Sequence, residues 1–330
     1  MVITRTPFRI SFFGGGTDYP TWYRENKGAV LTTTINKYCY INCRYLPPFF
    51  EHKHRIVYSK IENVKDINEI IHPAVKAILR FMKIKEGVEI HHDGDLPART
   101  GLGSSSAFTV GLLHALYALK GEMRTKSSLA AEAIHIEQDI IKENVGSQDQ
   151  IEVAFGGFNK INFNQDATFQ VTPIILKKDK LQQLQNHLIF YFTGLSRFAS
   201  EIAKEQIKNI SKKKMELSIM YQMVEEAIKI LNSNIAEISE FGKLLHESWK
   251  LKRSLTDKIS NPRIDEIYTA ARESGAVGGK LLGAGGGGFM VFFVKPEDQA
   301  KVKQRLKNLL QVPFQFENQG SQIILYQPDF

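Results

Sequence analysis

The sequence predicts an α+β protein built from two domains. Strand-like and helix-like segments follow one another without the regular alternation that produces a parallel α/β sheet. The chain has 330 residues, 43% of them hydrophobic, which is enough to fill more than one core. A polar, lysine-rich stretch, KKDKLQQLQN at residues 177–186, separates two halves of different character. We therefore expect domains at residues 1–180 and 181–330.

Strands and helices are mixed in the first half. Residues 2–13 and 29–46 are rich in Val, Ile, Thr, Tyr and Phe, which is typical of strands. Residues 72–83 carry apolar side chains at helical spacing, and Pro73 suits the first turn of a helix. The other elements predicted here are a strand at 87–93, helices at 104–119 and 126–142, and strand-like alternation at 151–175.

Helices dominate the second half. It opens with an apolar strand at 187–193, and long helical patterns follow from residue 198 to residue 254. The remaining predicted elements are a helix at 262–274, a strand at 289–294, a helix at 297–310, and strands at 313–316 and 321–326.

Composition excludes several classes of protein. No run approaches the about 20 apolar residues of a membrane-spanning helix, and MVITRTPFRI is not a secretory signal, so we expect a soluble, cytoplasmic protein with no membrane partner. Cys39 and Cys43 would share one face of a strand at a separation too long for an easy bridge, and two cysteines cannot complete a zinc site. They are expected to be buried thiols.

The formal net charge of +8 at pH 7 favours anionic partners such as nucleotides and phosphorylated small molecules. Basic residues are spread along the chain, and the one dense run, Lys212–Lys214, lies in a helical pattern that indicates a solvated face. Nucleic acid is therefore not an expected partner.

A glycine–serine segment, LPARTGLGSSSA at residues 96–107, is the strongest candidate for a binding site. Gly101 and Gly103 permit backbone conformations that other residues resist, and Ser104–Ser106 are suited to cap the helix predicted behind them. The N-terminus of a helix attracts phosphate through its N–H groups and its dipole. The Gly-Lys-Ser/Thr of a P-loop is absent, and the segment alone would be interpreted as an ordinary helix-capping turn.

A second glycine-rich segment, GAGGGG at residues 283–288, precedes the apolar run FMVFFV. A dinucleotide-binding loop would open a helix, whereas this one leads into a predicted strand. Glycines in this position indicate close approach of the backbone to a ligand or to another loop, and a glycine-rich hairpin without a ligand is the alternative.

A third segment, RTPFRISFFGGGTDY at residues 5–19, runs from a predicted strand into three glycines and a Thr-Asp pair. Asp18 only accepts hydrogen bonds when ionised, which suits it to hold two sugar hydroxyls, although a turn aspartate is the commoner use. Two more carboxylates, Glu137 in a predicted helix and Asp149 just beyond it, could bind magnesium or accept a hydroxyl proton. His91–His92 is not a favoured metal site, because adjacent strand residues point to opposite faces.

In this order and at these separations, the three glycine-containing segments resemble the GHMP kinases, a superfamily that includes galactokinase, homoserine kinase and mevalonate kinase. The resemblance extends from Arg5 to Phe293. It implies a phosphotransferase that uses ATP and Mg²⁺. It also implies an N-terminal domain like domain 2 of ribosomal protein S5, a ferredoxin-like C-terminal domain, and an active site between them.

The resemblance also assigns roles to individual residues. Asp149 would orient the acceptor hydroxyl or take its proton, and Arg9 would stabilise charge on the transferred phosphoryl group. Ser105 and Glu137 would hold magnesium. The residues expected to bind ATP are Pro97, Gly101, Leu102, Gly103, Ser104, Ser105 and Ser106, and those expected to bind the sugar are Gly15, Gly16, Thr17, Asp18, Gly285 and Gly286.

Within the superfamily, the GGGTDY segment lacks the Glu-His that precedes Thr-Asp in galactokinase and looks like the heptose branch. That branch implies phosphorylation of the anomeric hydroxyl of D-glycero-D-manno-heptose 7-phosphate to the 1,7-bisphosphate, on the route to activated heptose for bacterial surface polysaccharide. A kinase for another sugar, such as fucose, and a sensor that binds ATP and sugar without turnover are the alternatives. Whether the chain forms a homodimer is left open. The candidates for holding the distal phosphate, which the sequence does not rank, are Lys37, Arg44, Arg99, Lys160, Arg197 and Lys280.

Overall fold

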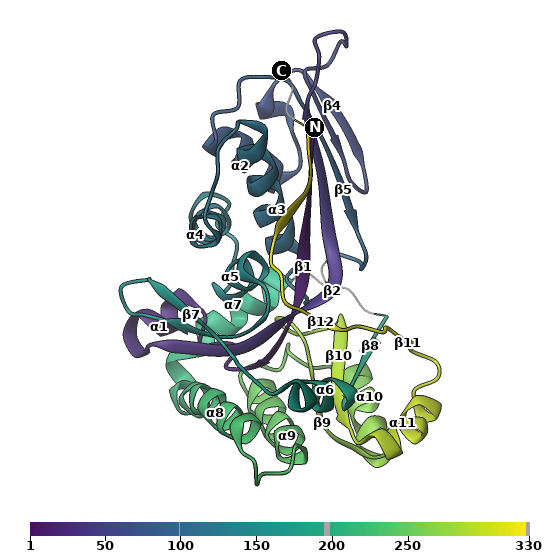
Figure 1. Ribbon diagram of the computed structural model, residues 1–330. Coiled ribbons are helices and arrows are strands. Elements are labelled where there is room, and N and C mark those ends of the chain that lie inside the picture. The colour runs from purple at the N-terminus through teal and green to yellow at the C-terminus, as the bar shows by residue number, and fades with distance from the viewer. Residues whose placement is uncertain (99, 195–198, 328–330) are drawn as a thin grey trace.

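A large sheet forms the upper part of the molecule in Figure 1, and a smaller sheet lies below it. The structure, a computed structural model, describes residues 1–98, 100–194 and 199–327. Within those residues the large sheet has nine strands: β1 (Val2–Phe13), β2 (Gly28–Tyr45), β3 (His54–Val57), β4 (Ile61–Val64), β5 (Val88–Gly94), β6 (Phe158–Phe163), β7 (Phe169–Pro173), β12 (Phe316–Glu317) and β13 (Gln322–Tyr326). The main order is β13-β1-β2-β5-β3-β4, with β12 and β6 also paired to the long strand β2 and β7 paired to β6.

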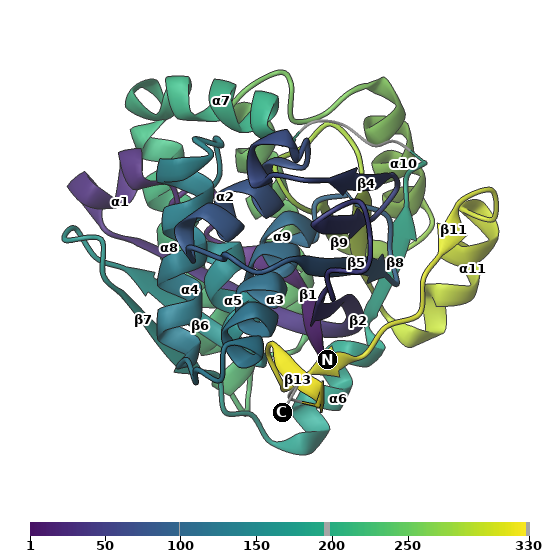
Figure 2. The same cartoon turned by 90° about the horizontal axis from the view of Figure 1, so that it is seen from above.

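Helices cover one face of the large sheet, as the view from above shows (Figure 2). They are α2 (Pro73–Phe81), α3 (Ser104–Leu119), α4 (Lys126–His135) and α5 (Gln148–Phe155), whereas α1 (Pro20–Asn26) lies to the side. Helix α3 packs against β1 and β2 and is buried over almost all of Ser106–Ala118, because its sequence is apolar on every side. The start of this central helix is therefore held firmly against the sheet.

The second half of the chain builds a four-stranded sheet within the described residues, in the order β11-β8-β10-β9. Its strands are β8 (Leu188–Phe192), β9 (Ala276–Leu281), β10 (Phe289–Val294) and β11 (Leu310–Gln311). The accompanying helices are α6 (Lys178–Asn186), α7 (Ala199–Asn209), α8 (Lys214–Asn232), α9 (Ser239–Ser254), α10 (Pro262–Glu273) and α11 (Gln299–Arg305). Helix α9 packs against β9 and also contacts β1, so it lies near the lower end of the large sheet in Figure 1.

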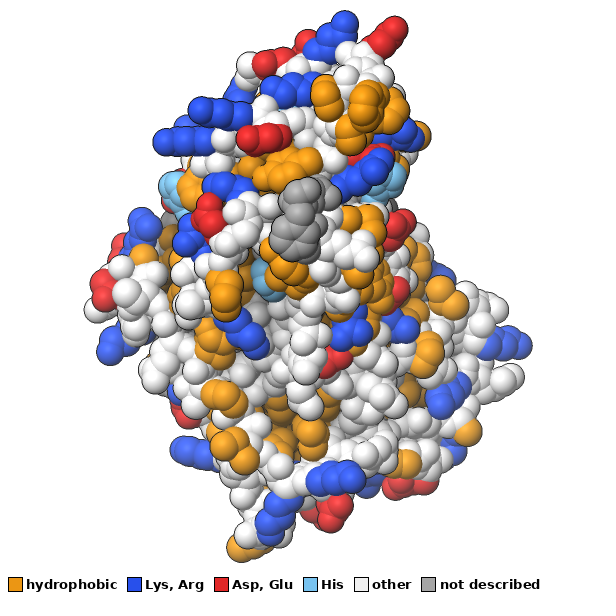
Figure 3. Space-filling view, turned by 45° about the horizontal axis from the view of Figure 1, so that its top comes forward, with side chains coloured by type: hydrophobic (Ala, Val, Ile, Leu, Met, Phe, Trp, Pro, Cys, Tyr) orange, Lys and Arg blue, Asp and Glu red, His pale blue; other side chains and the backbone are white. Residues whose placement is uncertain are grey.

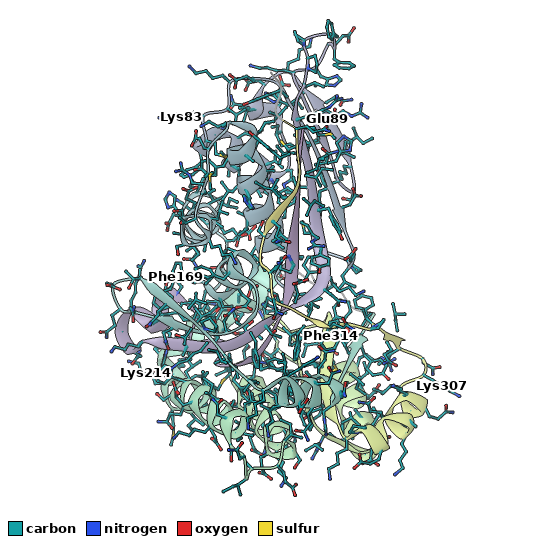
Figure 4. The ribbon with its side chains drawn as sticks, in the orientation of Figure 1. Lys83, Glu89, Phe169, Lys214, Lys307 and Phe314 are labelled. Carbon is teal, nitrogen blue, oxygen red and sulfur yellow. The ribbon has the colours of Figure 1, made fainter. Side chains whose placement is uncertain are left out.

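Aromatic side chains join the two parts. The rings of Phe12 and Phe13, at the end of β1, meet Phe241 of α9 nearly edge-on at 5.4 and 5.1 Å between centroids. On the returning C-terminal segment, Phe314 lies 5.5 Å from Phe190 of β8 and marks the level where the sheets meet (Figure 4). The end of β1 is thereby fixed against the second half of the chain.

The predicted α+β class is confirmed, but three segments differ from the expectation. The strand predicted from residue 151 is wrong at its start, because Gln148–Phe155 forms a helix. Residues Ile151–Ala154 are all buried, so the sequence there does not alternate between a buried and an exposed face. Gly156, at φ +70°, ends that helix. The polar stretch 177–186 forms α6 and buries Leu184. The helix predicted at 126–142 changes after His135 into a π-helical turn.

Strands β12 and β13 follow residue 181 in sequence but pair with β2 and β1 in the large sheet. Cys39 and Cys43 are buried free thiols, as predicted. No helix among the described residues is both long and apolar enough to cross a bilayer.

Candidate active site

A cleft of about 340 Å³ opens between the end of β1, the start of α3, and helices α7 and α9 of the second half. The predicted site residues that line it are Arg9, Gly15, Gly16, Asp18, Gly101, Gly103, Ser104, Ser105, Ser106 and Asp149. A larger groove of about 1110 Å³ lies between α6 and the end of α8, and none of its described lining residues was predicted as a site residue. The sequence motifs therefore converge on the smaller cleft.

The glycine–serine turn forms one wall of this cleft. Gly101 and Gly103 both adopt left-handed backbone angles, at φ +81° and +75°, which glycine accepts without steric cost. Gly103 caps α3, and Ser104–Ser106 form the first turn of that helix. The N–H groups of a first helical turn have no carbonyl partner within the helix, so this turn offers donors and a positive dipole end to an anion.

The second glycine segment packs directly against that turn. A Cβ on Gly283 would lie 2.3 Å from the Gly101 Cα, and a Cβ on Gly288 would lie 2.2 Å from the Thr100 carbonyl oxygen. Any side chain at either position would therefore push the two backbones apart. The segment joins the antiparallel strands β9 and β10 as a hairpin loop and approaches the glycine–serine turn closely.

Arg9 and Asp149 form a bidentate ion pair across the cleft floor. Arg9 donates from Nε to Asp149 Oδ1 and from Nη2 to Oδ2, both at 2.7 Å, and from Nη1 to the Gly101 carbonyl at 2.6 Å. The Arg9 side chain is 3% exposed, whereas Asp149 is 24% exposed. A buried guanidinium thus holds the carboxylate in one orientation beside the phosphate-binding turn.

Asp18 lies in the tight turn that follows β1. Its Oδ1 accepts a hydrogen bond from the Gly16 amide at 2.9 Å, and Gly146 approaches so closely that a Cβ there would lie 1.8 Å from Asp18 Oδ2. Burial raises the pKa of Asp18 above its ordinary value, and the charge of Asp149 adds to the effect. Two carboxylates therefore share one cleft.

Glu137 lies in the π-helical turn Ile136–Ile140, underneath the serines of α3. Its carboxylate accepts hydrogen bonds from Ser106 at 3.0 Å, from Thr109 at 2.8 Å, and from Gln150. Burial raises its pKa to about 7 although these donors oppose the shift. The structure pairs Glu137 with Ser106, while Ser105 faces the cleft as an exposed residue.

Several predicted residues do not line the cleft. Thr17 donates its hydroxyl to the Gly14 and Ala29 carbonyls, and Leu102 accepts the Arg9 amide. Pro97 accepts the Thr100 hydroxyl. Gly285 and Gly286 pack against the backbone of Ile259, while their neighbours Gly283 and Ala284 line the cleft.

Two buried charged residues near these groups were not predicted from the sequence. Lys252, on α9, lines the cleft, and its ammonium donates to the carbonyls of Leu281 and Gly283. Glu152, on α5, is fully buried, and burial raises its pKa to about 8. The register of α9 could have indicated Lys252, because it continues the helical spacing of the apolar Leu245 and Trp249.

Comparison with known proteins matches both halves of the chain. The model of the GHMP kinases N terminal domain matches residues 69–157, and that of the C terminal domain matches residues 231–311. The D-glycero-alpha-D-manno-heptose 7-phosphate kinase of Campylobacter jejuni is 29% identical over 316 residues, 92% of either chain. The galactokinase of Pyrococcus furiosus is 28% identical over 335 residues, 91% of this chain and 90% of its own.

A solved structure extends the match to three dimensions. The crystal structure of a D-glycero-D-manno-heptose 1-phosphate kinase from Bacteroides thetaiotaomicron has the same fold, with a TM-score of 0.76 at 24% identity over 97% of this chain and 98% of that one. The matched regions contain the glycine–serine turn, Glu137, Asp149 and the glycine loop 283–288. The chain belongs to the GHMP kinases and is a sugar kinase of that family, a phosphotransferase with an alcohol group as acceptor.

Proposed function

We propose that this enzyme transfers the γ-phosphoryl group of ATP to the anomeric hydroxyl of D-glycero-D-manno-heptose 7-phosphate. The observation that carries the proposal is the Arg9–Asp149 pair, which lies between the phosphate-binding turn and Asp18 in one cleft. The C. jejuni relative, which is named for this activity, aligns over 92% of the chain and supports the choice of sugar.

The proposed reaction needs little from the protein beyond position and charge. The amides of Ser105 and Ser106 would hold the nucleotide phosphates, and Asp18 would accept hydrogen bonds from sugar hydroxyls. Asp149 would accept the proton of the anomeric hydroxyl. The hydroxyl oxygen would form a bond to the γ-phosphorus of ATP while the bond from that phosphorus to ADP breaks. Arg9 would stabilise the charge on the transferred group.

The oxygen donors around Glu137 fit a magnesium ion. Glu137 contacts the Ser106 hydroxyl in the first turn of α3, and a carboxylate close to a phosphate-binding turn suits a hard cation that takes its other ligands from phosphates and water. No group of three or more acidic, His or Cys side chains in the described part of the chain could hold a metal by itself. We propose that Glu137 and Ser105 would hold magnesium, which when bound would neutralise charge on the nucleotide phosphates.

A coupled assay of ADP release tests the proposal. The purified enzyme is given ATP with heptose 7-phosphate, free heptose, L-fucose and galactose in turn, and phosphorus NMR locates the new phosphate. Highest kcat/KM for heptose 7-phosphate, with the new phosphate on C1, is the expected result. Preference for fucose would replace the proposed substrate, and no turnover of any sugar would favour the sensor.

A further inference from the structure

Two buried lysines project into the cleft from the second half of the chain. Lys252 is 6% exposed and Lys280, on β9, is 2% exposed. Lys280 donates to the Phe12 carbonyl at 2.8 Å, and Lys252 donates only to backbone carbonyls. Neither forms an ion pair with any described carboxylate. A buried ammonium that lacks an ionic partner is costly, so two of them in one cleft indicate a site built for an anion.

These lysines differ from the other basic residues of the protein. On the face shown in Figure 3, Lys and Arg side chains stand at the surface, interspersed with acidic and uncharged ones. Among the candidates for a distal phosphate, Lys160 pairs with Glu225, and Arg44 pairs with Glu89, far above the junction of the sheets (Figure 4). Lys37 does not line the cleft. Arg99 and Arg197 lie outside the described residues.

The position of Lys280, beside the segment that leads to Asp18, points to the acceptor rather than to the nucleotide. The phosphates of ATP have their own donors in the first turn of α3. Lys280 is bonded to Phe12, two residues before the glycine turn that leads to Asp18. Ser11, which precedes Phe12 in the sequence, also lines the cleft. Its Oγ is buried without a hydrogen-bond partner among the described residues.

We propose that Lys252 and Lys280, with the Ser11 hydroxyl, bind the phosphate ester of a phosphorylated acceptor. The cleft would then have two phosphate sites, one for the nucleotide and one for the sugar phosphate. This inference rests on the proposed kinase function but not on heptose being the sugar. Burial lowers the pKa of Lys252 to about 8, and burial and repulsion from Lys252 hold the pKa of Lys280 well below its ordinary value. A dianion bound between them would reverse both effects.

Lys252→Met tests the site, because it removes a charge but keeps a long apolar side chain. We expect KM for the phosphorylated sugar to rise about 10- to 100-fold, the effect of losing a charge-assisted hydrogen bond, with KM for the free sugar and for ATP changed less than twofold. Removal of an unpaired buried charge should leave the melting temperature equal or higher, so unfolding would not explain the loss. The matched control is Lys250→Met, since Lys250 is exposed on the same helix and pairs with Glu247.

Binding of inorganic phosphate gives a readout that needs no turnover. In calorimetry on enzyme saturated with a non-hydrolysable ATP analogue, phosphate should bind the wild type and the Lys250→Met variant with similar affinity. Its affinity for the Lys252→Met variant should be at least tenfold lower. A rise in KM for ATP alone would assign the lysines to the γ-phosphate and overturn the inference, as would equal phosphate affinity in all three proteins. Heptose 7-phosphate could prove not to be a substrate while another sugar phosphate has a higher kcat/KM than its free sugar. If Lys252→Met removes that difference in kcat/KM, the phosphate site stands and only the proposed substrate is wrong.

Discussion

Arg9 and Asp149, 140 residues apart in sequence, are joined by two parallel hydrogen bonds of 2.7 Å. The third donor of Arg9 bonds to the Gly101 carbonyl, so one buried side chain links the carboxylate to the turn that precedes α3. A carboxylate fixed in this way needs no reorganisation before it meets a hydroxyl group. The pair therefore makes the sharpest predictions about catalysis.

Asp149→Asn should lower kcat by about 100-fold or more, because an amide cannot take the acceptor's proton. The affinity for ATP should stay within about twofold of wild type, since the amides of α3 remain in place. Both are measurable by steady-state kinetics and by calorimetry with an ATP analogue. The control is Asp139→Asn, at an exposed position. Wild-type turnover in Asp149→Asn would exclude the base role.

Arg9→Lys should also lower kcat, by about 10- to 1,000-fold, although the charge is kept. A lysine cannot span both carboxylate oxygens and the Gly101 carbonyl at once, so Asp149 loses its fixed orientation. If the role of Arg9 is electrostatic alone, the lysine variant should retain most of the turnover and Arg9→Met should not. Measuring kcat for both variants at saturating substrate separates these cases.

Local segments made most of the site predictable. A single segment of about a dozen residues contains both the glycines at 101 and 103 and the capping serines, so the phosphate-binding turn could be predicted from local sequence. The pairing of Arg9 with Asp149 could not be predicted in this way, because it depends on how β1 and α5 meet in the fold. The resemblance to a family gave each of the two residues a role.

Lys252 illustrates the opposite difficulty. A lysine in a helix of mixed composition is usually solvated, so the helical spacing of Lys252 with Leu245 and Trp249 is a weak signal. The packing of α9 against β9 is what turns this lysine into the cleft. Glu152 was missed for a similar reason. The apolar residues around it favoured a strand, whereas the structure has a helix there that ends at Gly156. Long-range packing, rather than local pattern, decides such positions.

Gly283→Ala should weaken ATP binding and lower stability, because its Cβ would lie 2.3 Å from the Gly101 Cα. Gly121→Ala is a matched control: Gly121 has the same φ of +74° but open space around it, so it carries only the left-handed strain of about 1–2 kcal/mol. Melting temperature and ATP-analogue affinity should therefore fall further in Gly283→Ala. Equal effects would show that the contact between the two glycine segments is not needed.

Glu152→Gln should change how stability depends on pH. Asn159 donates to Glu152 Oε2 at 3.2 Å, and Oε1 is buried without a partner among the described residues. Burial raises the pKa of Glu152 from 4.5 to about 8, so the native state binds a proton that the unfolded state releases between these values. The free energy of unfolding of the wild type should therefore fall as pH rises from about 4.5 to about 8.

The glutamine variant lacks this titration and should gain stability over the wild type across that range, by an amount on the order of a few kcal/mol. Urea unfolding at pH 5 and pH 8 measures the difference, and Glu266→Gln, at an exposed position, controls for the loss of a charge. If the wild type and Glu152→Gln change in parallel between the two pH values, Glu152 is ionised in the folded protein. Its charge would then have to be balanced by Arg9, which would place Glu152 in the same network as Asp149.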